Sequence, residues 1–91
     1  MQYESQGSVL EQIITEVVTL RELLLFNDDV NTFDHVINCL CDICGHDPIQ
    51  AEQCAWIVHH NGKCGVKRGT LDALEPLCTA LHDRGLSAAI E

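Results

Sequence analysis

The sequence is organised around Asn27-Asp28-Asp29-Val30-Asn31-Thr32-Phe33-Asp34-His35-Val36, which joins the apolar run Leu23-Leu24-Leu25-Phe26 to a segment with helical spacing. No lysine or arginine lies between Arg21 and Lys63, so nothing nearby in the sequence neutralises the two adjacent carboxylates. Most acidic turns of this kind are solvated connections between two elements. Here we favour a second interpretation, in which the side-chain oxygens are acceptors for a cationic group.

The elements on either side of this turn follow from the spacing of apolar residues. Residues 21 to 27 are predicted to form a strand that ends at the turn. After the turn, apolar residues recur at the spacing of one helix face, and these are Phe33, Val36, Ile37, Leu40, Cys41 and Cys44. We expect Asn31 to cap this helix, with Asp34 three residues on as in a capping box, and Gly45 to end it.

A second helix is announced by Asp47-Pro48, because aspartate is a preferred N-cap residue and proline fits the first helical position. Asn61-Gly62 is expected to end this helix. Residues 63 to 68 then make a short second strand, terminated by Gly69.

A third helix is predicted to begin after Thr70 and to end at Gly85. Pro76 lies inside it, and an interior proline removes one backbone hydrogen bond. We therefore expect a kink there, or a separate turn over residues 71 to 75. Residues 86 to 90 form the last strand.

The predicted order is β-α-α-β-α-β, which indicates an α/β two-layer sandwich with a three-stranded sheet and three helices packed on one face. Residues 21–91 form this domain, and residues 1–20 are expected to be a flexible N-terminal extension. Within that extension, residues 9 to 20 combine helical spacing with β-branched residues, so their conformation stays open.

Composition excludes several classes of partner. The chain has 91 residues, 14 acidic and 5 basic, for a formal net charge of -9, and such a surface repels nucleic acid. It contains no run of about 20 apolar residues that could span a membrane and no recognisable signal peptide. We expect a cytoplasmic protein with reduced cysteines and no cofactor.

The chain resembles the ClpS adaptor family in three places. The first is Asn27-Asp28-Asp29 through Val36, the second is Ala51 followed by Val58-His59-His60-Asn61-Gly62-Lys63, and the third is Gly85-Leu86 to Ile90-Glu91. The resemblance covers about residues 21 to 91. The combination of the acidic turn before one helix and Val-His-x-x-Gly-Lys at the end of the next is specific.

This resemblance implies an adaptor and not an enzyme. Family members bind proteins with a destabilising N-terminal residue, an N-degron, typically Phe, Tyr, Trp or Leu. They deliver these proteins to a Clp-family AAA+ unfoldase of the ClpA or ClpC type, which is coupled to the peptidase ClpP. The N-terminal tail of the family engages the unfoldase, a role that residues 1–20 would take here.

The resemblance also implies which residues would bind the substrate's α-amino group. Asn27 and Asp29 match the family's acceptors for the amine, and His59 matches the family's histidine, whose ring nitrogen accepts a further hydrogen bond. Asp28 would mainly make the electrostatic potential of the site more negative. An ammonium carries three donors and needs several acceptors. Because a histidine side chain ordinarily gains a proton near pH ~6.5 and then cannot accept, we expect binding to weaken below about pH 6.

The substrate's apolar side chain would enter a pocket between the first two helices. The matching positions are Asn31, Phe33, Val36, Ala55, Val58 and Leu86. Many family members have methionine at the positions of Phe33 and Ala55, and threonine at that of Asn31. Because methionine adapts to several shapes, we expect this pocket to have altered preferences and to accept Trp or Tyr more readily.

A zinc site is a competing interpretation of Cys39-x-Cys41-x-x-Cys44 with His46, because tetrahedral zinc sites use cysteine and histidine. Positions 39 and 41 are ~200° apart on a helix, however, so they cannot easily share an ion with Cys44. We therefore expect no metal.

Two other functions compete with the adaptor. Cys64 lies close in sequence to His59 and His60, as in some cysteine enzymes, but no third orienting group is evident. The stronger alternative is a generic protein-interaction domain of the same fold that has lost N-degron binding.

Overall fold

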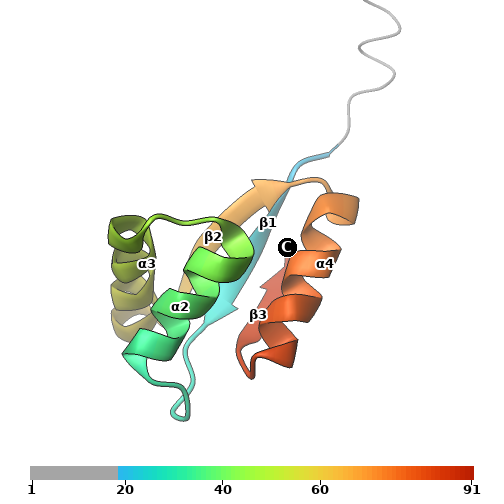
Figure 1. Ribbon diagram of the computed structural model, residues 1–91. Coiled ribbons are helices and arrows are strands. Elements are labelled where there is room, and N and C mark those ends of the chain that lie inside the picture. Colours follow the sequence, from blue (N-terminus) through green and yellow to red (C-terminus); the bar gives the residue numbers. More distant parts are fainter. Residues whose placement is uncertain (1–18) are drawn as a thin grey trace, which may run out of the picture.

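The computed structural model describes residues 19–91, which form a three-stranded sheet with three helices packed on one of its faces (Figure 1). The elements are β1 (Arg21–Phe26), α2 (Phe33–Cys44), α3 (Pro48–Asn61), β2 (Lys63–Gly69), α4 (Leu71–Asp83) and β3 (Ser87–Ile90). The predicted order and two-layer architecture are confirmed. The prediction of a flexible extension over residues 1–20 falls almost wholly on residues 1–18, outside the described residues.

Among residues 19–91, the first strand, β1, is the central strand of the sheet. The strand order is β2-β1-β3, and both neighbours are antiparallel to β1. The residue after β1, Asn27, donates its backbone N–H to the carbonyl of Gly62 at 2.9 Å. The turn that follows β1 therefore starts at the end of the central strand and is held beside the end of α3.

The core lies between the sheet and the helices. Its largest fully buried side chains are leucines from three elements: Leu23, Leu25, Leu40, Leu74 and Leu81. Burying each contributes about 1.5–3 kcal/mol relative to exposure. All six cysteines are free. The four that are buried act as small apolar core residues.

Most predicted helix ends are confirmed. Asp47 accepts a hydrogen bond from the backbone N–H of Gln50 at 2.8 Å, and Thr70 accepts one from Ala73 at 3.2 Å. Gly45 and Gly62 end α2 and α3 with positive φ values of 70° and 89°, a conformation that glycine adopts without steric cost.

The predicted cap of α2 is wrong. Thr32, and not Asn31, is the N-cap residue, and its Oγ1 accepts from the backbone N–H of His35 at 3.1 Å. Thr32 directly precedes the first helical residue, Phe33, so its hydroxyl is in reach of the free amides of the first turn. The side chain of Asn31 is used elsewhere, as described below.

Pro76 does not divide the third helix, because α4 runs without interruption from Leu71 to Asp83. The prediction of a separate turn over residues 71 to 75 is therefore wrong. The hydrogen bond that Pro76 cannot donate would have gone to the carbonyl of Asp72. Asp72 lies in the exposed first turn, where water can satisfy that carbonyl.

Within residues 19–91, no helix is both long enough and apolar enough to cross a membrane.

Candidate functional site

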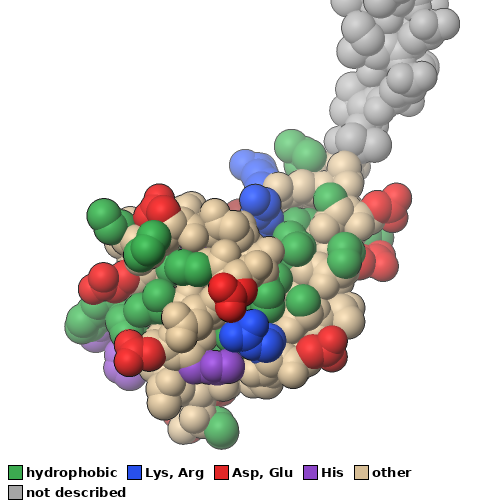
Figure 2. Space-filling model, in the orientation of Figure 1, with side chains coloured by type: hydrophobic (Ala, Val, Ile, Leu, Met, Phe, Trp, Pro, Cys, Tyr) green, Lys and Arg blue, Asp and Glu red, His purple; other side chains and the backbone are tan. Residues whose placement is uncertain are grey.

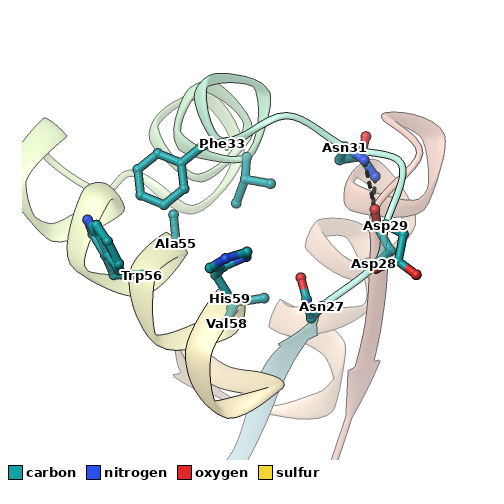
Figure 3. A pocket seen from close by; sticks show the side chains of 10 residues that line it. Asn27, Asp28, Asp29, Asn31, Phe33, Ala55, Trp56, Val58 and His59 are labelled. Atoms are coloured by element: carbon teal, nitrogen blue, oxygen red, sulfur yellow. Dashed lines mark hydrogen bonds between the residues drawn. The ribbon is translucent and has the colours of Figure 1, made fainter.

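A cavity of about 490 Å³ opens where the turn after β1 meets the start of α2 and the second half of α3 (Figure 3). This volume falls within the range of small-ligand sites, about 300–1,000 Å³. Its lining residues are Asn27, Asp28, Asp29, Asn31, Phe33, Val36, Ala55, Trp56, Val58 and His59. The cavity therefore collects all four residues predicted to bind the amine and five of the six predicted for the apolar pocket.

One of the two adjacent carboxylates holds the turn in shape. Asp28 Oδ1 accepts from the backbone N–H groups of Val30 and Asn31, at 2.9 and 2.8 Å, and its Oδ2 accepts from Asn31 Nδ2 at 2.8 Å. Burial raises the pKa of the Asp28 carboxyl, but the hydrogen bonds from Asn31 and Val30 outweigh burial and hold its pKa below the ordinary value. Asp28 is thus a structural acceptor whose oxygens are already occupied.

Asn31 joins this turn to the far end of the chain. Besides its bond to Asp28, its Nδ2 donates to the carbonyl of Gly85 at 2.8 Å. Gly85 follows the end of α4 and has a φ of 83°. The Asn31 side chain therefore uses both of its amide hydrogens to fix one wall of the cavity.

The other carboxylate is free to bind a ligand. Among the hydrogen bonds and ion pairs of residues 19–91, none involves the Asp29 side chain, and the only Lys or Arg ion pair is Arg84 with Asp42 at 3.5 Å. Asp29 is also exposed. Figure 3 shows the Asn27 side chain rising from the end of β1 into the space that the His59 ring also faces. The polar rim therefore presents oxygen and nitrogen acceptors with no cation beside them.

The opposite wall is apolar and comes from two helices. Ala55 and Val58 of α3 are buried and form its base, whereas Phe33 of α2 and Trp56 of α3 are 37% and 50% exposed at its rim. The Phe33 and Trp56 rings meet edge to face, with centroids 5.8 Å apart. Because Ala55 is small, it leaves room in the cavity beside these two touching rings.

Leu86, the remaining predicted pocket residue, lies one layer deeper. It is buried beneath the main cavity and lines a separate hollow of about 20 Å³ together with Asn31, Val36 and Val58. This hollow is about large enough for one water molecule. Leu86 and Val58 belong to the buried core, and Val36 packs against that core.

Trp56 is a lining residue that sequence reasoning missed, because a tryptophan in a helix is normally assigned to the core. A signal was present in the spacing. The buried face of α3 consists of Ala51, Cys54, Ala55 and Val58, and position 56 is 100° further around the helix than Ala55. A large ring there has to lie at the edge of the buried face.

The geometry does not support the two competing interpretations, a zinc site at Cys39, Cys41 and Cys44 or a nucleophilic Cys64. Within residues 19–91, no group of three or more His, Cys, Asp or Glu side chains is arranged to hold a metal ion. His46 is buried and its Nε2 hydrogen-bonds to the carbonyl of Val66 at 2.6 Å. Burial and the neighbouring Cys54 thiol raise the pKa of the Cys64 thiol to about 12, which makes Cys64 a poor nucleophile.

Comparison with known proteins agrees with these features. The family described as "ATP-dependent Clp protease adaptor protein ClpS" matches residues 19–89. The ATP-dependent Clp protease adapter proteins ClpS of Campylobacter jejuni subsp. jejuni (strain 81-176) and subsp. doylei are each 37% identical over 59 residues, which cover 63% of this chain. The match spans 62% of the length of these relatives.

A solved structure shares the fold. It is described as Agrobacterium tumefaciens ClpS2 bound to L-phenylalaninamide, and it superimposes with a TM-score of 0.79 over 82% of this chain and 98% of that chain. Its sequence identity is 20%, so this likeness bears on the fold alone.

Proposed function

This chain belongs to the ClpS family of Clp protease adaptors, and we propose that it binds proteins whose first residue is bulky and hydrophobic. The substrate would be an N-degron that begins with Phe, Tyr, Trp or Leu. The chain would deliver it to a Clp-family AAA+ unfoldase of the ClpA or ClpC type, coupled to ClpP, with residues 1–20 engaging the unfoldase. The family is one of adaptors and not of enzymes, which fits a site built for binding.

One observation carries this proposal: unpaired acceptors and an apolar wall line the same cavity. The free N-terminus of a protein is the one place on a polypeptide where a primary ammonium group and a side chain leave the same carbon atom. A site that offers acceptors on one side and apolar surface on the other is complementary to that arrangement. An internal segment of a protein has no such ammonium group to offer.

The polar rim supports recognition of the ammonium group. Its three N–H donors would bond to the Asn27 side-chain oxygen, the Asp29 carboxylate and one unprotonated nitrogen of His59. The bond to Asp29 would be charge-assisted, and such bonds are about twice as strong as neutral ones. Asp28 would contribute indirectly, by holding the turn that presents Asp29.

The apolar wall supports recognition of the first side chain. Burying a Phe or Leu side chain between Phe33, Ala55 and Val58 would contribute about 1.5–3 kcal/mol. A β-branched side chain would be wide at the mouth of the cavity, so Ile and Val should bind less well. The ligand of the structurally similar ClpS2, L-phenylalaninamide, has both a free amine and an aromatic side chain, which supports the same chemistry here.

The experiment is a fluorescence anisotropy titration of the full chain with peptides that differ only in their first residue or in acetylation of the α-amine. We expect a Phe-initiated peptide to bind and the acetylated form to bind at least about tenfold more weakly, since bonds to a charged group are worth about 1.5–3 kcal/mol. Asn27→Ala should weaken binding of the free peptide without unfolding the domain. Equal binding of free and acetylated peptides would instead indicate a generic interaction domain that has lost N-degron binding.

A further inference from the structure

The single tryptophan of the chain stands at the cavity without a part in amine recognition. Trp56 lies one residue beyond Ala55 on α3, and half of its surface is exposed. We propose that Trp56 is a specificity-determining residue, whose ring forms a rigid aromatic wall that selects aromatic first residues over leucine. This inference rests on the proposed function, because it concerns the side chain that enters the same cavity.

The Trp56 ring is held in place by two other rings. The His60 ring, one turn later on α3, stacks on it with centroids 4.5 Å apart and planes 7° from parallel. Phe33 of α2 meets it nearly at right angles, with centroids 5.8 Å apart and planes at 73°. An exposed side chain normally pays rotamer entropy when a ligand fixes it. Here contacts within the protein already fix the ring.

The position of these rings places aromatic surface where a ligand side chain would enter. Figure 3 shows the small Ala55 side chain beside the Phe33 and Trp56 rings, which contact each other edge to face. A side chain that enters above Ala55 would therefore lie against both rings. A ligand ring could add edge-to-face or offset contacts with them, and each such pair is worth about twofold to tenfold in affinity beyond the area it buries. Leucine would gain only the burial.

The surface around α3 also offers a control residue for Trp56. Figure 2 shows apolar side chains gathered over α3, at the left of the view, with histidines beside them. Ile57 is similarly exposed, at 41%, but it does not line the cavity. Ile57 is therefore a matched control: it is an exposed apolar residue on the same helix, next to Trp56 and outside the site.

The test is the ratio of the dissociation constants of two peptides that differ only in starting with Phe or with Leu. Since the amine is common to both, the ratio isolates the side chain. We expect Trp56→Leu to reduce the preference for Phe by about threefold to tenfold, and Ile57→Ala to leave it unchanged. His60→Ala should reduce the preference partly, because the ring loses its support, and His60→Tyr should restore it.

A second readout uses the same ring as a probe. Because Trp56 is the only tryptophan in the chain, its emission in the wild-type protein should change as the Phe-initiated peptide saturates the site. Trp56→Phe keeps a ring at this position and should keep most of the preference, which guards against a general loss of folding in Trp56→Leu.

The outcomes separate the two proposals. If free and acetylated peptides bind equally, the proposed function fails, and this inference fails with it. If the free amine is required but Trp56→Leu leaves the ratio of Phe to Leu binding unchanged, only the inference is overturned. An unchanged Trp56 emission at saturation would also overturn it.

Discussion

Two neighbouring aspartates at the start of the site have different roles. Asp28 accepts three hydrogen bonds within its own turn, whereas the Asp29 carboxylate accepts none from residues 19–91. The difference follows from geometry, because a carboxylate can bond to backbone N–H groups two and three residues later in an Asx turn. Only the first aspartate of the pair faces the turn in this way. Of these two adjacent aspartates, Asp28 therefore stabilises the turn and Asp29 is left free to bind a substrate.

We predict that Asp28→Asn and Asp29→Asn affect different properties. Asp28→Asn should lower the free energy of unfolding by about 1–2 kcal/mol, because hydrogen bonds to a charged acceptor become weaker. Asp29→Asn should leave stability within about 0.5 kcal/mol of wild type, yet weaken peptide binding. Urea denaturation measures the first effect, and equal destabilisation by the two substitutions would contradict the division.

The Asp28 effect should also depend on pH. The pKa of Asp28 is lowered from its ordinary value of 3.8 in the folded protein, so the unfolded state binds the proton more readily. Its contribution to stability is complete above pH 3.8 and is lost as the pH falls through the lower folded pKa. The stability difference between wild type and Asp28→Asn should therefore shrink on acidification below pH 3.8. A difference that stays constant into this range would contradict the assignment.

The raised pKa of Cys64 gives a prediction about reactivity. With its pKa near 12, this thiol should be almost wholly protonated at pH 8 and should react with iodoacetamide more slowly than a free cysteine, whose pKa is about 8.5. Mass spectrometry of the folded protein after partial alkylation measures this. Labelling of Cys64 at or above the rate of free cysteine would support the cysteine-enzyme interpretation instead.

At the scale of elements, the end of α3 links the helix to the site. Gly62 ends α3 with a φ of 89°, and its carbonyl accepts from the backbone N–H of Asn27. The same residue thus ends one helix and fixes the first residue of the acidic turn. His59 lies in the last turn of α3, so this link also sets the distance between the histidine and the turn.

We predict that Gly62→Ala weakens binding, whereas Gly45→Ala does not. Both glycines have positive φ and neither Cβ would meet another atom within 4 Å, so both substitutions should cost about 1–2 kcal/mol of stability from backbone strain alone. Of the two, only Gly62 is hydrogen-bonded to a residue of the site, Asn27. Comparing thermal denaturation with Phe-peptide affinity separates the effects, and equal affinity losses in the two variants would argue against a link through Gly62.

At the scale of the whole molecule, periodicity predicted the element order and the two-layer architecture. Apolar helix faces, cap residues and glycines at or just after the helix end are local signals, and the helices within residues 19–91 carry them. The error at Asn31 arose because a long-range partner decides the role of that side chain. Asn31 was predicted as a cap because the distant carbonyl of Gly85, which it binds, is invisible in the local sequence.

The candidate site shows the same division between local and long-range information. The residues proposed to bind the amine could be named because they match a family pattern and, apart from His59, are close together in sequence. Leu86 was predicted to line the cavity but lines a separate small hollow, and Trp56, which was not predicted as a site residue, lines the rim. Depth in a cavity depends on how α3 packs against α2 and the sheet. Residue spacing within one helix does not determine that packing.

The most direct test of amine recognition is a double-mutant cycle between Asp29 and the substrate's α-amino group. Isothermal titration calorimetry would compare wild type and Asp29→Ala with two Phe-initiated peptides, one with the amine and one in which a hydroxyl replaces it. If Asp29 bonds to the ammonium, we predict a coupling energy of about 1.5–3 kcal/mol. A coupling energy below about 0.5 kcal/mol, as found for independent sites, would contradict that bond.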